Sequence, residues 1–455
     1  MARRAVDNNS SNAQAQDSAR DQTVRAHDTR TQRTHAAVVP LLTSHLCRCC
    51  LWVFACLVGL VSSIIIFFVS VYLLIPSSGI VYPYSLDQAP QLTGPYQVNE
   101  RLSSASRILY MRAVAPEALA VSDDGVYIYT GLADGRIVEI SVQTEEISRQ
   151  WRYRFPENES KCAAPHFASS LAGFYDAEVD CGRPLGVRLR HRTLYVLDPY
   201  TGFYQLHLDT GLVHLYFASH THGRRVHGKP MMFLNDLDFV DDETIVFTDS
   251  STKYSRKDYA MVLMEANPDG RVIKYNMRTD QFQLIADGLR FPNGVVVVND
   301  GRSLLVAECQ MARIIRINLT ESHQLAQRKE IFAANLPGFP DNIRVSRDRA
   351  HLWVPFSAVR MHGAVNFFDQ LGPRPWLREL VTKLLTPRQI ALGLKTFKPT
   401  HSMVAKLDLN TGRPVDSLHD PGARSLRVTS HLLELGHYYY IGSYANPFLA
   451  KVKIS

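Results

Sequence analysis

A run of apolar residues from Leu51 to Ile75 contains no charged side chain. About 20 such residues suffice for a helix to cross the hydrocarbon core of a bilayer. A cleavable signal sequence is normally shorter and lies nearer the N-terminus. We therefore predict one transmembrane helix at residues 51–75, and the long segment that follows must fold on one side of a membrane.

The residues on either side of this run predict its direction. Residues 1–50 carry seven Arg and four Asp, whereas residues 76–100 contain no Lys or Arg. Positive charge near a span is retained on the cytosolic side. We expect residues 1–50 to be a disordered cytosolic tail, because this polar segment buries too little apolar surface to fold, and residues 76–100 to be a linker. The chain is then a type II protein of the plasma membrane or endoplasmic reticulum, with a retained signal anchor and a luminal or extracellular C-terminal domain.

Two features of the C-terminal part agree with this topology. The sequons that begin at Asn158 and Asn318 are acceptors for N-linked glycans on the non-cytosolic side. Cys162 and Cys181 bracket a short polar loop and could close it as a disulfide in an oxidising compartment.

One pattern recurs after residue 100: a short apolar strand, a polar turn and a second strand. Its six copies begin at Val126, Leu194, Ile245, Leu304, Leu352 and Tyr438. Their spacing suits four-stranded units, and placing such units around an axis leaves few exposed sheet edges. We predict an all-β fold, a six-bladed β-propeller over residues 101–455. A pair of β-sandwiches is the alternative.

One stretch, residues 372–398, interrupts this pattern. Between Trp376 and Leu385 the apolar residues recur at helical spacing, while Arg378 and Lys383 lie elsewhere on the helical wheel. The stretch predicts an amphipathic insert. It is either a helix packed over the propeller face or, over residues 376–395, a helix that rests on the membrane.

A propeller brings the loops of all its blades together at one end of its central channel, so residues far apart in sequence can form one site. Oxygen-bearing side chains recur about once per blade along this chain: Glu117, Asn235, Asn293, Asp341 and Asn342. Two carboxylates and three amide carbonyls form a hard donor set, which suits Ca²⁺ with its six to eight oxygen ligands. The sequence therefore predicts a calcium site at the channel end.

Longer motifs around these residues resemble the strictosidine synthase-like family. They are Cys181-Gly-Arg-Pro-Leu-Gly186, Asn235-Asp-Leu-Asp238, Phe247-Thr-Asp-Ser-Ser-Thr-Lys-Tyr254, Gly288-Leu-Arg-Phe-Pro-Asn-Gly294 and Leu336-Pro-Gly-Phe-Pro-Asp-Asn-Ile-Arg344. The resemblance extends from about residue 100 to the C-terminus. It implies a six-bladed propeller, a disulfide between Cys162 and Cys181 and a glycan near Asn158. It also implies weak arylesterase-type hydrolysis, as in the related calcium-dependent paraoxonases and lactonases.

The chain departs from two branches of that resemblance. True strictosidine synthases condense an amine with an aldehyde through a Glu that corresponds to Glu434, but they generally lack the Asn and Asp set present here. Paraoxonases use a His dyad as the base, and Asp198 stands around the place where one of those His is expected.

We therefore expect a calcium-dependent hydrolase acting on a small-molecule ester or lactone. One alternative is a non-catalytic surface propeller that binds ligands or proteins, and a third is amine–aldehyde condensation with Glu434 as the catalytic residue. Nucleic acid is not an expected partner, because the formal charge of +7 is modest and no basic stripe interleaves with aromatic residues.

Overall fold

The computed structural model describes residues 32–77, 79–153, 162, 171–219, 224–299, 301–319, 329–396 and 399–454. It divides the chain into two compact units, Met1–Ser70 and Val71–Ser455.

The described part of the first unit is helix α1, which spans Gln32–Leu74 and ends within the residue range of the second unit. Its segment Cys50–Leu74 is long and apolar enough to cross a membrane, and the side chains of this segment are largely exposed to the surroundings. The expected apolar helix is therefore confirmed. The helix begins at Gln32, inside the segment expected to be disordered, because extending a helix costs no new nucleation. Residues 1–31 lie outside the described residues.

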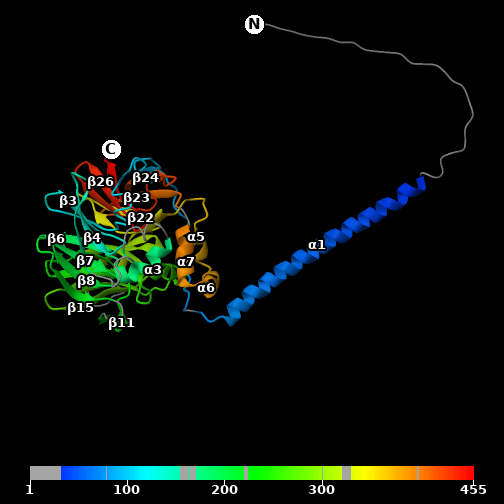
Figure 1. Cartoon of the computed structure of the whole chain (residues 1–455), viewed down its shortest axis with the longest axis horizontal. Helices are drawn as coiled ribbons and strands as arrows, with labels where there is room; N and C mark the ends of the chain where they lie inside the picture. Colours follow the sequence, from blue (N-terminus) through cyan, green and yellow to red (C-terminus); the bar gives the residue numbers. More distant parts are fainter. Residues whose placement is uncertain are drawn as a thin grey trace, which may run out of the picture. The chain divides into compact units, whose positions relative to one another are not determined.

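The second unit is a propeller of six sheets, so the fold prediction is confirmed (Figure 1). Within each sheet, strands that are neighbours pair antiparallel. The first three sheets in chain order are β2–β5 (Leu119–Val121, Tyr127–Gly131, Arg136–Ser141, Ile147–Arg152), β6–β9 (Gly186–Arg190, Thr193–Asp198, Gly202–His207, Val213–Ala218) and β12–β15 (Leu234–Phe239, Thr244–Asp249, Gly270–Asn276, Gln281–Leu289).

The remaining sheets complete the ring. The fourth sheet is β16–β19 (Pro292–Val298, Ser303–Glu308, Arg313–Asn318, Lys329–Ala333), and the fifth contains β20–β24 (Gly338–Pro340, Arg344–Val345, His351–Val359, His401–Asp408, Pro414–Pro421). A short hairpin, β10 with β11 (Arg225–Val226, Lys229–Pro230), lies outside the six sheets. Each of the six repeats found in the sequence corresponds to a pair of adjacent strands in one of these sheets.

The sixth sheet closes the propeller with strands from both ends of the domain. β25, β26 and β27 (His431–Leu435, Tyr438–Gly442, Leu449–Lys453) are joined by β1 (Ser106–Ile108). β1 pairs with β27, so that Ser106 lies opposite Lys451. This pairing covers an edge that would otherwise expose unpaired backbone groups.

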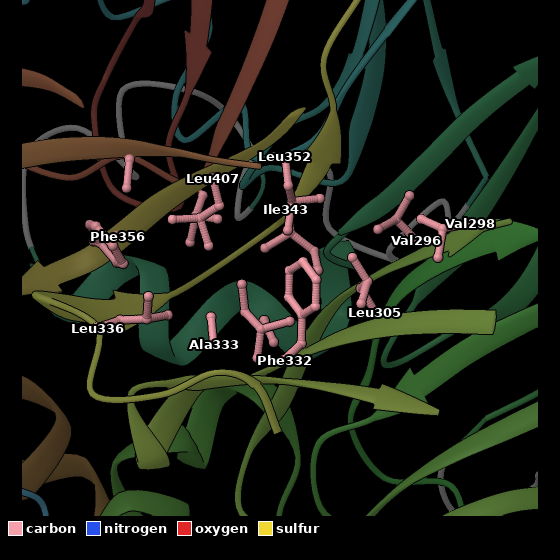
Figure 2. Close-up of a cluster of buried hydrophobic side chains, with 14 of the residues drawn as sticks. Val296, Val298, Leu305, Phe332, Ala333, Leu336, Ile343, Leu352, Phe356 and Leu407 are labelled. Carbon is pink, nitrogen blue, oxygen red and sulfur yellow. The ribbon is translucent and has the colours of Figure 1, made fainter. Parts of the chain in front are cut away.

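The core lies between neighbouring blades, and the period of the strands explains why. Successive side chains of a strand point to opposite faces. On β17, Leu304 packs with the third blade, whereas Leu305 packs with the fifth. Figure 2 shows Leu305 and Leu407, from the fourth and fifth blades, gathered in one apolar cluster between their sheets. The inner strands are buried on both faces and therefore form nearly continuous apolar runs.

The amphipathic insert forms two helices, α6 (Pro375–Leu384) and α7 (Pro387–Thr396), preceded by α5 (Phe367–Leu371). Pro387 explains the break, since proline clashes with a preceding helical turn but is well suited to the first turn of a new helix. Ile390 and Ala391 of α7 pack against α4 (Tyr259–Glu265), which lies on the propeller. The packing of the insert over the propeller is confirmed, and its contact with a membrane stays a prediction.

Helix α3 (Leu171–Cys181) ends in the predicted disulfide. Cys181 is bonded to Cys162 with a Cα–Cα distance of 5.7 Å, so that prediction is confirmed. Of the two sequon residues, Asn318 is half-buried at the end of β18, and Asn158 lies outside the described residues.

Candidate functional site

Four of the five predicted calcium ligands line one cavity at an end of the central channel. Glu117 lies just before β2, Asn235 and Asn293 lie near the starts of β12 and β16, and Asp341 follows β20. These are the innermost strands of four blades, so the roughly regular spacing in sequence becomes convergence in space. The cavity has a volume of about 390 Å³.

Irregular strand pairing directs two of these side chains. The register of β12 against β13 shifts between Leu234 and Leu237, around Asn235. The register of β16 against β17 shifts in the same way between Pro292 and Val295, around Asn293. Bulges of this kind redirect a side chain and interrupt the ladder. The same device at the same place in consecutive blades turns two amides toward the channel.

Glycine allows the blades to approach closely beside the ligands. A Cβ atom on Gly294 would lie 2.5 Å from the carbonyl oxygen of Asp341, and one on Gly442 would lie 2.3 Å from the carbonyl oxygen of Glu117. Both distances are too short for any other residue. The glycine of the Asn293-Gly294 pair is therefore required by packing against the next blade, and this packing places Asp341 beside Asn293.

Three acceptor oxygens of the set are buried without a partner. Oδ1 of Asn235, Oδ1 of Asn293 and Oδ1 of Asp341 make no hydrogen bond within the described residues. The Asn235 amide is oriented, because its Nδ2 donates to Ser250 Oγ at 3.1 Å and its oxygen is left for the cavity. Buried acceptors are nearly always satisfied, and a hard cation is one ligand that could satisfy these three oxygens together. Their chemistry fits Ca²⁺.

The two carboxylates of the site differ in how their charge is compensated. Glu117 accepts a hydrogen bond from Arg183 Nη2 at 2.9 Å, which occupies one of its carboxylate oxygens. Asp341 is buried and forms no ion pair within the described residues. Burial, with a further contribution from the charge of Glu117, raises the pKa of Asp341 well above its usual range. A cation at this position would remove both penalties.

Asn342 takes a different position from the other four. It is buried, and its backbone N donates to the carbonyl oxygen of Ser430 at 3.0 Å, but it does not belong to the described residues that line the cavity. Its role as a ligand stays a prediction.

The remainder of the cavity is largely apolar. Aromatic and aliphatic side chains from four blades and from α5 form its wall: Leu185, Phe233, Phe291, Phe339 and Phe368. Such a wall suits the apolar body of a small molecule, and the few polar atoms at its base would orient a polar group.

A chain of hydrogen bonds begins at the cavity and runs across the fifth blade. His401, at the start of β23, lines the cavity. Its Nε2 lies 2.8 Å from Nδ1 of His419 on β24, and Nε2 of His419 lies 2.8 Å from Ser417 Oγ. The Ser417 hydroxyl donates to the carbonyl oxygen of Pro95 at 2.7 Å.

This arrangement assigns the proton positions. A carbonyl only accepts, so the single proton of Ser417 goes to Pro95 and Ser417 must accept from His419 Nε2. Nδ1 of His419 then accepts from His401 Nε2, which leaves Nδ1 of His401 as a lone-pair acceptor. Burial lowers the pKa of His401, and burial together with the neighbouring ring lowers that of His419 to about 4. Both rings are therefore neutral at pH 7.

Comparison with known proteins identifies the family of this chain. The strictosidine synthase family model matches residues 235–322, and the model for the N-terminal part of strictosidine synthase-like proteins matches residues 94–140. The adipocyte plasma membrane-associated protein of Danio rerio is 36% identical over 374 residues, which are 82% of this chain and 83% of that protein. The human protein of the same name is 34% identical over 375 residues, with the same coverage. The chain belongs to the strictosidine synthase-like family.

A more distant likeness is seen among solved structures. A gluconolactonase from Xanthomonas campestris aligns with a TM-score of 0.46 and 16% identity, covering 84% of this chain and 98% of that one. At this distance the likeness is no guide to activity.

Glu434, the residue that matches the condensing Glu of strictosidine synthases, lies away from the cavity. β25 leaves the channel at His431, and three residues of extended strand carry Glu434 about 10 Å further out. Its Oε2 accepts from the backbone N of Arg347 at 2.5 Å. Glu434 is not among the described residues that line the cavity.

At two further positions, Asp198 and His401, the structure adds what the sequence could not show. Asp198 is buried and makes local hydrogen bonds: its oxygens accept from the backbone N atoms of Arg183, Tyr200 and Thr201. The sequence did not single out His401, because its partner lies 18 residues away on another strand. The only signal was its position, at the start of a strand and at the same end as the ligand set.

Proposed function

We propose that this strictosidine synthase-like protein is a membrane-anchored, calcium-dependent hydrolase of small aryl esters or lactones. The single observation that carries the proposal is the set of three buried, unpartnered oxygens, Asn235 Oδ1, Asn293 Oδ1 and Asp341 Oδ1, at the base of a largely apolar cavity. Such an arrangement costs several kcal/mol without a ligand. A channel end that serves only to pack the blades together would not require three unpartnered oxygens.

Different parts of the cavity would perform different steps of ester cleavage. Calcium, when bound, supplies positive charge that polarises a carbonyl oxygen and stabilises the charge that develops on it. The wall formed by Phe233, Phe291 and Phe339 holds the apolar part of the substrate and limits the access of water. Nδ1 of His401 is the candidate proton acceptor for the attacking water, with the proton of its Nε2 held toward His419.

The anchor and the disulfide support a non-cytosolic location for the propeller. We propose that α1 is a type II signal anchor. A disulfide between Cys162 and Cys181 persists in oxidising compartments, where calcium is also abundant. Glycans on Asn158 and Asn318 would follow from the same topology.

The test measures turnover and metal binding separately. Purified full-length protein in detergent is assayed with phenyl acetate and an aromatic lactone, with calcium and after chelation. Asn235→Ala and Asn293→Ala are compared with Asn410→Ala, a surface asparagine. We expect chelation and the two cavity variants to abolish turnover, and the calcium-dependent rise in melting temperature to shrink in the cavity variants alone.

Two outcomes contradict the proposal. Full turnover after chelation would exclude the calcium mechanism. A normal calcium response without hydrolysis of any ester or lactone would favour the alternative, a propeller that binds ligands and uses the metal for rigidity.

A further inference from the structure

A second pocket adjoins the cavity and has a different chemical character. Its volume is about 370 Å³, and it lies between α7, the end of α3 and the sixth blade. Six cationic side chains line it, against a single carboxylate, that of Glu178. The six are Arg107, Arg183, Arg256, Lys395, Arg424 and Arg427.

Ion pairs within the described residues neutralise only part of this charge. Arg183 is paired with Glu117 at 2.9 Å and Arg256 with Glu178 at 2.5 Å. Arg424 is paired with an exposed partner outside the pocket, Glu100, at 3.0 Å.

Two of the other cations, Arg107 and Arg427, direct charge toward the pocket that no ion pair within the described residues neutralises. Arg107 donates to a neutral acceptor, the carbonyl oxygen of Arg424, and it forms no ion pair within the described residues. Arg427 is exposed and has no carboxylate partner within the same residues. Lys395 is half-buried near Arg256, and burial together with this neighbouring charge lowers its pKa to about 8. The pocket therefore has an excess of positive charge.

The cavity and the second pocket share part of their lining. Arg256, Tyr259, Leu394, Pro399 and Tyr444 line both of them. One side of this shared lining faces the apolar, calcium-suited cavity and the other faces the cations. Arginine and lysine in such a concave site bind carboxylate and phosphate oxygens through charge-assisted hydrogen bonds.

We propose that the basic pocket binds the anionic group, a carboxylate or a phosphate, of a small molecule whose apolar part lies in the adjoining cavity. The first half of this proposal, that the pocket holds an anion, rests on the charge of the pocket itself. That the anion belongs to the hydrolysed substrate rests on the proposed function, and it narrows the substrate class to anionic esters or lactones.

The experiment removes two cations that have no place in the calcium site. The double variant Lys395→Gln, Arg427→Gln is compared with the wild type and with Arg413→Gln, an exposed arginine on the turn before β24. The first probe is inorganic phosphate, titrated by calorimetry without calcium at low and high salt. We expect saturable binding that weakens with salt, and a loss of about tenfold or more in affinity in the double variant but not in Arg413→Gln.

The second probe separates the two sources of the anion. 4-Acetoxybenzoate and its neutral methyl ester are compared as substrates of the same proteins. If the anion belongs to the substrate, the double variant raises KM for 4-acetoxybenzoate about tenfold, with kcat unchanged and with both constants unchanged for the methyl ester. If KM does not distinguish the two esters while phosphate still binds, the pocket holds a free anion and the substrate half of the proposal is wrong.

The outcomes that reject the anion site differ from those that reject the hydrolase. Absence of saturable phosphate binding in the wild type, or equal binding in the double variant, overturns the site. Phosphate binding that depends on Lys395 and Arg427, without hydrolysis of either ester, leaves the site standing and rejects the proposed function.

Discussion

Replacing Asp341 by asparagine should raise stability without calcium and reduce the stabilisation that calcium provides. Asp341 is 1% exposed and lies near the buried carboxylate of Glu117. Without a cation, a carboxylate here is buried and uncompensated, and asparagine has the same shape without the charge. In chelator we therefore expect Asp341→Asn to raise the free energy of unfolding by about 1–3 kcal/mol.

In calcium this advantage of the variant shrinks or disappears. An ion at one hundred times its dissociation constant adds about 2.7 kcal/mol to the wild type. For a propeller of roughly 350 residues, an unfolding entropy of about 2.1 cal/mol/K per residue converts this into a rise of about 4 °C in Tm. Loss of a charged ligand that weakens binding about tenfold removes about 1.4 kcal/mol, so the rise in Asp341→Asn falls to about 2 °C.

The assay is thermal and chemical unfolding of the full-length protein in detergent, with calcium and with chelator. Asp123→Asn, at an exposed aspartate on a turn, is the control and should leave both values unchanged. A variant at Asp341 that keeps the whole calcium-dependent rise, or that is less stable than the wild type in chelator, would refute the reasoning.

Three further predictions follow from other parts of the molecule. Replacing both Cys162 and Cys181 by serine should cost about 3 kcal/mol, since the disulfide closes a loop over a sequence separation of 19; unfolding in denaturant measures it, and an unchanged midpoint would contradict it. The fold holds the pKa of His419 at about 4, below the value of the unfolded chain, so stability should fall as pH drops from about 6.5 to 4, by at most about 3 kcal/mol. His419→Asn should flatten that part of the pH profile, and an equally steep profile would assign the loss to other groups. Glycosidase treatment of protein from secretory cells should shift the wild type by two glycans, and Asn158→Gln and Asn318→Gln by one each; absence of any shift would argue against the proposed topology.

Local features of the chain were enough to predict much of the architecture. The uncharged run at 51–75 predicted the apolar helix, because length and lack of charge alone decide whether a segment can cross a bilayer. The six repeats predicted six blades, because each strand pair is a local unit whose apolar runs and turns are visible in sequence. The recurrence of Asn235, Asn293 and Asp341 predicted a common site for the same reason: each stands at the same position of its own repeat.

Contacts between distant segments decided the rest. Glu434 matches the position of the condensing Glu in the family motif. However, β25 runs outward from the channel and places Glu434 away from the cavity, which only the path of this strand shows. His401 gains its partner from the neighbouring strand. The basic pocket collects Arg107, Arg183 and Lys395 from three parts of the chain that share no motif. Sequence determined what each blade and the anchor could be, because those properties are local. Tertiary structure decided which side chains meet, because the electrostatics and hydrogen bonding of a site depend on distances between residues that the chain order does not contain.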